Sequence, residues 1–86
     1  MIIKAEVNSN QPVVMVVLDE NNETISGAKL RIENTTYEFY SNINGECLIP
    51  SELIHHGSIV IIESISYKTQ RIDIKSNYLK INLVNR

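Results

Sequence analysis

Apolar side chains recur at every second position over most of this chain, which is the spacing of a β-strand with one buried face. Residues 28–33, "AKLRIE", alternate cleanly, with Leu30 and Ile32 expected inward and Arg31 outward. No segment of useful length has apolar residues three to four positions apart, as an amphipathic helix would. The sequence therefore predicts an all-β fold, with further alternating strands at residues 35–41, 46–50, 68–75 and 78–84.

Two other segments are apolar at both parities. Residues 12–19, "PVVMVVLD", suit a strand that is covered on both faces or flanked by the N-terminal segment. Residues 58–66, "SIVIIESIS", predict a central strand with both faces covered. Residues 51–57 predict a short helical turn with Ser51 as its N-cap and Gly57 at its end. About seven strands joined by short turns predict an antiparallel β-sandwich.

Residues 41–46, "SNINGE", follow a strand whose Tyr37 and Phe39 are both expected to face the core. The dipeptide Asn44-Gly45 is a strong short-range signal for a hairpin, because Gly accepts a positive φ and Asn tolerates the left-handed region. We therefore expect Asn44 and Gly45 to form a structural turn, a tight hairpin that leads directly into the next strand.

The same stretch shares part of the spacing of a calcium-binding loop, through Asn42, Asn44 and Gly45. In that motif an Asp leads the loop and a bidentate Glu closes it at its twelfth position. Tyr40 and Ser51 occupy those two positions here. Since the two strongest carboxylate ligands are missing, the turn is favoured over a metal site.

Other candidate chemistry is sparse. Cys47 is the only cysteine, which excludes an intramolecular disulfide, and its alternation with Ile49 predicts an inward side chain that packs in the core. His55 and His56 are adjacent, with no Asp or Cys at a useful spacing, and are expected in an exposed loop. We therefore assign no catalytic residue, no metal ligand and no cofactor.

The formal net charge is -2, and the eight basic residues are interspersed with acidic ones. Nucleic-acid binding, which needs a concentrated basic face, is disfavoured. No apolar run approaches the roughly 20 residues that span a bilayer, and the first residues lack the pattern of a signal peptide. We expect one domain at residues 1–86, without an export signal and without direct membrane insertion.

Residues 16–83 resemble the carboxypeptidase regulatory-like domain, a small sandwich of the transthyretin (prealbumin) type with an Ig-like Greek key. "VVLDENNETISGAKLRI" contains the strand ending in Asp19, the polar turn and the Gly27-Ala28 pair of that family. "SNINGEC" occupies the position of its hairpin, and "VIIESISYKTQ" resembles its strand that ends in Gly-Tyr-Lys. The family pattern has Gly where this chain has Ser66, and Phe where it has Cys47.

The resemblance implies a noncatalytic accessory module of a secreted or cell-envelope protein, such as those of Bacteroidetes, with a periplasmic, cell-surface or secreted location. A small structural subunit of a larger assembly is the alternative. A third alternative is a transthyretin-like hydrolase. That enzyme family reads His-Val-Leu-Asp at its first strand, whereas this chain has Val16 in place of the His, and it also lacks the enzyme's terminal Tyr-Arg-Gly-Ser. The chain is therefore expected not to be an enzyme.

Tyr40 and Tyr78 are expected on the outer side of their strands or at a strand's first residue. Exposed aromatic residues favour contacts with proteins or glycans, although tyrosine is also common on edge strands for its β-propensity alone. We therefore predict Tyr40 and Tyr78 as a possible interaction surface for a protein or glycan partner. The pattern leaves the oligomeric state open.

Overall fold

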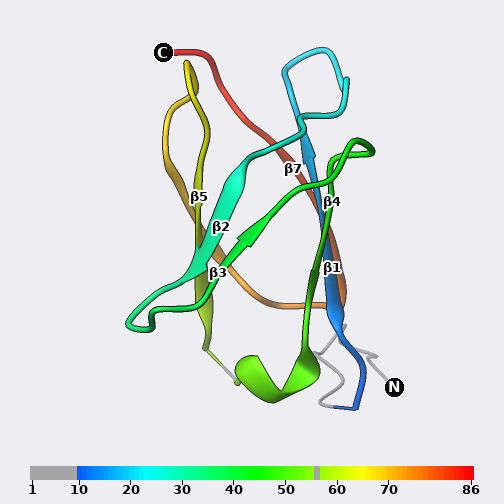
Figure 1. Cartoon of the computed structure of the whole chain (residues 1–86), viewed down its shortest axis with the longest axis vertical. Helices are drawn as coiled ribbons and strands as arrows, with labels where there is room; N and C mark the ends of the chain where they lie inside the picture. The colour runs from blue at the N-terminus through cyan, green and yellow to red at the C-terminus, as the bar shows by residue number, and fades with distance from the viewer. Residues whose placement is uncertain (1–9, 56) are drawn as a thin grey trace, which may run out of the picture.

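The computed structural model describes residues 10–55 and 57–86, which fold into two stacked β-sheets (Figure 1). The three-stranded sheet has the order β4-β1-β7 and the four-stranded sheet the order β3-β2-β5-β6. The strands are β1 (Val13–Leu18), β2 (Lys29–Ile32), β3 (Glu38–Tyr40), β4 (Glu46–Ile49), β5 (Ile59–Glu63), β6 (Gln70–Asp73) and β7 (Tyr78–Asn82). The seven strands confirm the predicted all-β sandwich.

One strand pair differs from the expected antiparallel arrangement, because β7 runs parallel to β1. The chain reaches β7 from β6, which lies in the opposite sheet, so no hairpin fixes the direction of β7 against its neighbour. The backbone N–H of Val14 donates to the carbonyl of Asn77 at 2.8 Å, where β7 begins beside the start of β1. The three-stranded sheet is therefore mixed.

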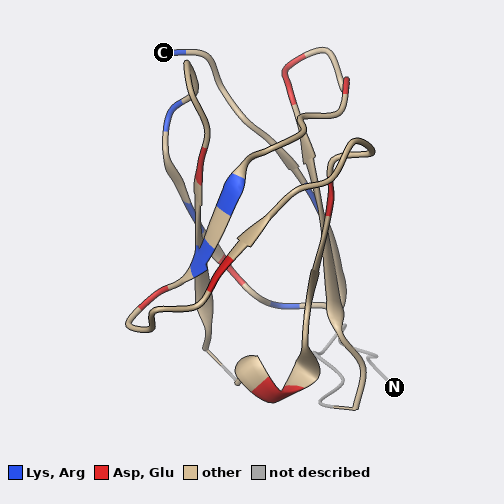
Figure 2. Cartoon of the chain, in the orientation of Figure 1, with Lys and Arg blue, Asp and Glu red and all other residues tan. Residues whose placement is uncertain are grey.

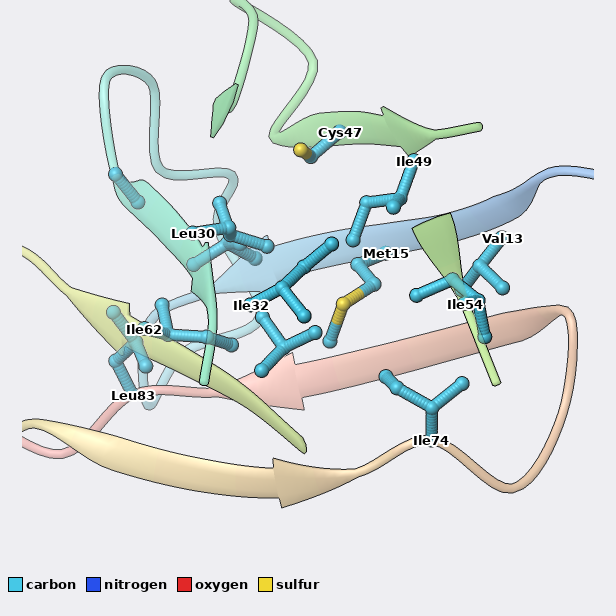
Figure 3. Packing of buried hydrophobic residues seen from close by; sticks show 13 residues of the cluster. Val13, Met15, Leu30, Ile32, Cys47, Ile49, Ile54, Ile62, Ile74 and Leu83 are labelled. Carbon is cyan, nitrogen blue, oxygen red and sulfur yellow. The ribbon is translucent and has the colours of Figure 1, made fainter. Parts of the chain in front are cut away.

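The core lies between the sheets and follows the predicted alternation. Met15 of β1, Leu30 of β2, Ile49 of β4 and Ile62 of β5 are fully buried. Figure 3 shows Met15 extending from β1 into the space between the sheets, toward side chains of the opposite layer. Inward positions of both sheets thus supply one shared core.

Two expectations about the four-stranded sheet need correction. β5 is central, between β2 and β6, but only its inner positions are buried, because no strand of the described residues packs over its outer side. Tyr37 does not face the core with Phe39. β3 begins only at Glu38, so Tyr37 lies in the loop that precedes it and is 50% exposed, whereas Phe39 packs against the core.

The predicted helical turn is a single 3₁₀ turn, η1 (Ser51–Leu53). Ser51 is its first residue and not its N-cap, because Pro50 precedes the turn and no side chain caps it. Ile54, which is 5% exposed, ties the end of this turn to the core. His55 is exposed, and His56 lies outside the described residues.

The expected hairpin at residues 41–46 is wrong in one respect: the strands on its two sides belong to different sheets. β3 pairs with β2 and β4 pairs with β1, so this segment crosses from one layer to the other. Ser41, which is buried, holds the crossing in place. Its Oγ accepts a hydrogen bond from the Ala28 N–H at 2.9 Å and donates one to the Ile25 carbonyl at 2.7 Å.

Candidate interaction surface

The outer side of the three-stranded sheet is the most apolar outer surface that the described strands form. We call this surface the β1 face. In the pairing register, Val14 lies between Leu48 and Tyr78 in one row, and Val16 lies between Glu46 and Lys80 in the next. Since residues opposite each other on paired strands point to the same side, each row lies on one side of the sheet. The β1 face consists of Val14, Val16, Leu18, Glu46, Leu48, Tyr78, Lys80 and Asn82.

The centre of the β1 face is apolar and its flanks are exposed. Val16 and Leu18 are only 8% exposed although they point away from the core. Leu48 is 60% exposed and Tyr78 is 56% exposed. The face is hollowed by a shallow groove of about 490 Å³, whose lining includes Val16, Leu18, Tyr78 and Lys80. β1 is apolar at both its odd-numbered and its even-numbered positions. One set of these side chains lies in the core, and the other set lies beneath this groove.

The outer side of the four-stranded sheet is different, because charged residues of opposite sign cover it (Figure 2). Arg71 donates two hydrogen bonds of 2.8 Å to the Glu33 carboxylate, and its hydrogen bonding lowers the pKa of Glu33. Lys29 lies 3.8 Å from Glu63. Charged side chains are more stable when exposed to solvent than when buried in an interface. β1, by contrast, carries no charged residue. The two outer surfaces are therefore chemically distinct.

The two predicted tyrosines lie on these two different surfaces. Tyr78 begins β7 and belongs to the β1 face. Tyr40 ends β3 in the four-stranded sheet, is 60% exposed, and its hydroxyl lies 3.4 Å from a carboxylate oxygen of Glu38. The outer sides of two stacked sheets face in opposite directions. Tyr40 and Tyr78 are therefore exposed but cannot form one continuous patch.

The turn at residues 42–46 borders the β1 face and positions Glu46. The Asn42 Oδ1 accepts hydrogen bonds from the backbone N–H groups of Asn44 and Glu46, both at 2.9 Å, and the Gly45 N–H donates to the Asn42 carbonyl at 2.8 Å. Gly45 has a φ of +73°, while Asn44 does not adopt a positive φ. Asn42 therefore organises the turn, and its oxygen is engaged by backbone donors. Asn42 thus serves the turn through its side chain.

The described residues contain no group of three or more His, Cys, Asp or Glu side chains placed to hold a metal ion. Cys47 is 3% exposed, and burial raises its pKa to about 11. A thiol with such a pKa is protonated at neutral pH and is a poor nucleophile. Cys47 therefore packs in the core, as its alternation with Ile49 predicts.

We expect native Cys47 to resist alkylation by iodoacetamide at pH 8, while the urea-unfolded chain reacts readily.

Because the pKa of Cys47 in the folded chain is raised above the unfolded value of about 8.5, the thiol's contribution to stability is fully present below pH 8.5 and is lost as the pH rises through about 11. The stability advantage of the wild type over Cys47→Ala should shrink by up to about 3 kcal/mol between pH 8 and 11. Chemical denaturation of both proteins across that range tests this, and rapid labelling of the native thiol would contradict it.

Four outward residues of the β1 face were not predicted from the sequence as part of an interaction surface: Glu46, Leu48, Lys80 and Asn82. Each reads as an ordinary outward residue of its own strand, and only the register with β1 joins them into one surface. The one sequence feature that pointed to this surface was residues 12–19, which are apolar at odd-numbered and even-numbered positions alike. That pattern indicates a second covered face, but not which strands flank it.

No family model and no curated protein matches the chain. Several solved structures are similar in fold, including the following two. One is a chain of a type II cohesin–X-dockerin complex from Acetivibrio cellulolyticus, a C-terminal interface mutant, with a TM-score of 0.58 and 19% identity over 86% of this chain and 51% of that one. The other is the C-terminal domain of the Caf1A usher, with a TM-score of 0.58 and 8% identity over 86% of this chain and 97% of that one.

This chain thus spans about half the length of the matched chain from the cohesin–X-dockerin complex. At these identities the similarity concerns the fold, an Ig-like β-sandwich, and not individual residues. Among the described residues, no helix has the length and apolar character needed to cross a bilayer.

Proposed function

We propose that residues 1–86 form a single noncatalytic accessory module that binds protein through the β1 face. The observation that carries this proposal is the central strand β1, whose outward Val14, Val16 and Leu18 form an apolar strip, with the exposed Leu48 and Tyr78 on the two sides of Val14. A contiguous apolar patch rimmed by polar residues is typical of a protein interaction site. Isolated exposed apolar residues are common and carry no such meaning.

The polar rim also favours a protein over a glycan as the partner. Side-chain amides are common sugar-binding groups, and the groove that Tyr78 helps to line also contains Asn82 and Asn22. The Asn82 Nδ2 and the Asn22 Oδ1 are already engaged, because the Asn82 Nδ2 donates to the Asn22 Oδ1 at 2.7 Å and to the Asp19 carbonyl at 2.8 Å. Charged Glu46 and Lys80 at the edges suit the polar rim of a protein interface.

The noncatalytic part of the proposal rests on the residues that would have to perform chemistry. Val16 stands where a transthyretin-like hydrolase has its His, and it contributes to the apolar strip. Cys47 is buried in the core with a raised pKa. We therefore retain the carboxypeptidase regulatory-like family and a cell-envelope or secreted setting, such as that in Bacteroidetes, as the finer form of this proposal.

The second structural neighbour lends support by analogy. In the Caf1A usher C-terminal domain, conserved hydrophobic clusters on the surface are important for F1 antigen assembly. Applied to this chain, the analogy favours a role in assembly for the apolar β1 face. A small structural subunit of a larger assembly, the alternative to an accessory module, would use the same surface.

Photo-crosslinking in the native host tests the proposal. With p-benzoylphenylalanine at Leu48 on the β1 face, we expect crosslinks to protein, whether to a second copy or to another polypeptide. With the same group at Glu38, exposed on the charged outer side of the four-stranded sheet, we expect none. Equal crosslinking from both positions, or crosslinks from Glu38 alone, would contradict the assignment of the interface to the β1 face.

A further inference from the structure

The charges on the β1 face are arranged so that the face complements a second copy of itself. Glu46 and Lys80 lie on opposite sides of Val16, with the acid on β4 and the base on β7. We propose that the chain forms a symmetric homodimer in which two β1 faces pack together. This inference rests on the proposed function, and it specifies the partner of that surface.

The symmetry follows from the register. Consider a two-fold axis that lies in the interface and runs parallel to β1. This rotation places β4 of one copy opposite β7 of the other, and each row of residues keeps its position along the strand direction. Glu46 then faces the partner subunit's Lys80, and Lys80 faces the partner subunit's Glu46. The valines of the central strand face their own copies. One rotation therefore produces two interchain ion pairs around an apolar centre.

The neighbouring row agrees with the same axis. Leu48 and Tyr78 lie on opposite sides of Val14, so the rotation places Leu48 against the partner subunit's Tyr78. A two-fold axis perpendicular to β1 would instead exchange the two rows, and would place Leu48 against Glu46 and Tyr78 against Lys80. The parallel axis pairs apolar with apolar and opposite charges with each other, so we assign the dimer to it.

Both charged groups are available for such pairing. The salt bridges formed by the described residues are Lys29 with Glu63 and Arg71 with Glu33, and neither involves Glu46 or Lys80. Glu46 and Lys80 are separated by β1, and two strand spacings amount to roughly 10 Å. Two stacked sheets also lie about 10 Å apart, a separation that long Glu and Lys side chains at the edge can bridge.

The size of the face determines the expected strength. Three strands span about 14 Å, and the six residues of β1 about 20 Å, so the contact is smaller than the roughly 800 Å² per partner of a standard stable interface. We therefore expect a weak dimer with a dissociation constant of about 10 μM to 1 mM. The chain should be mainly monomeric at low micromolar concentration, and half or more of the chains should be dimeric at millimolar concentration.

Sedimentation equilibrium of the full chain at about 5 μM to 2 mM tests the proposal, with salt near 50 mM to limit screening of the ion pairs. The weight-average mass should rise from the 9.8 kDa of one chain toward twice that value. A constant mass of 9.8 kDa up to 2 mM would overturn the dimer. Assembly that continues beyond two copies would overturn the closed two-fold arrangement.

Charge reversal tests the geometry. Glu46→Lys and Lys80→Glu should each raise the dissociation constant at least about tenfold, because each places like charges opposite one another twice. The double variant E46K/K80E should restore it to within about threefold of the wild type. Glu38→Lys makes the same charge change as Glu46→Lys on the outer side of the four-stranded sheet and should leave association unchanged. Melting temperatures confirm that each variant is folded.

The outcomes separate this inference from the proposed function. A wild type that stays monomeric while Leu48 crosslinks to a different protein retains the β1 face as an interface and overturns the homodimer. Dimers that are insensitive to both single reversals, or that the double variant fails to restore, overturn the assigned two-fold axis. A monomeric chain without crosslinks from Leu48 overturns both proposals.

Discussion

Replacing Gly45 with alanine should lower the free energy of unfolding by about 3 kcal/mol or more, the sum of a backbone and a packing effect. Gly45 has a φ of +73°, which costs an L-residue about 1–2 kcal/mol. A Cβ atom at this position would also lie 2.6 Å from the Val17 carbonyl oxygen. That oxygen cannot move freely, because it accepts a hydrogen bond of 2.9 Å from the Ile25 N–H.

Gly27 provides the matched control, because its φ is +76° but a Cβ atom there would meet nothing within 4 Å. Gly27→Ala should therefore show the backbone cost alone, about 1 kcal/mol, or about 4–8 °C in melting temperature for a chain of this size. Gly45→Ala should melt more than 10 °C below the wild type. Equal effects of the two substitutions would contradict the close approach of this crossing segment to β1.

Truncating Met15 to alanine should cost about 2–5 kcal/mol, because the side chain is fully buried and its loss leaves a cavity. Met15 lies in the central strand of its sheet, between Cys47 of β4 and Leu79 of β7. Neighbouring side chains are held by both layers of the sandwich and cannot fully collapse into the gap. Urea denaturation monitored by circular dichroism measures the loss as a lower midpoint at an unchanged slope.

Leu48→Ala is the control for this second substitution. Leu48 follows Cys47 on β4 but points outward and is 60% exposed, so its truncation should change the free energy of unfolding by less than about 0.5 kcal/mol. The same variant should weaken association through the β1 face. A loss of stability comparable to that of Met15→Ala would place Leu48 in the core and remove it from the interface.

The strands could be predicted from the sequence because burial imposes a period of two on each of them. Leu30 and Ile32 of β2, and Cys47 and Ile49 of β4, are buried as their alternation predicts. The assignment of strands to sheets was less accessible. The Asn44-Gly45 signal predicts a local reversal, but whether the two flanking strands pair with each other depends on competition from β2, which pairs with β3, and from β1, which is distant in sequence from its partner β4.

For the candidate site too, the exposure of a residue could be predicted from its own strand, whereas its neighbours in the sheet could not. The exposure of Tyr78 follows from its place at the start of an alternating strand. Its place beside Val14 follows from the parallel pairing of β1 with β7, which joins residues about 64 positions apart and leaves no local trace. The opposite charges of Glu46 and Lys80 indicate a self-complementary surface only when the strand register shows that both lie beside Val16.

In the proposed dimer the β1 face meets another protein surface, and that surface is a second copy of the chain. The most direct measurement is a dilution series of ¹⁵N-labelled protein followed by NMR. On concentration from about 20 μM to 1 mM, the largest amide shifts should occur at Val14, Val16, Glu46, Leu48 and Lys80, while Lys29, Arg31 and Arg71 on the opposite surface remain unchanged. Shifts confined to that opposite surface, or no shifts at all, would contradict the claim.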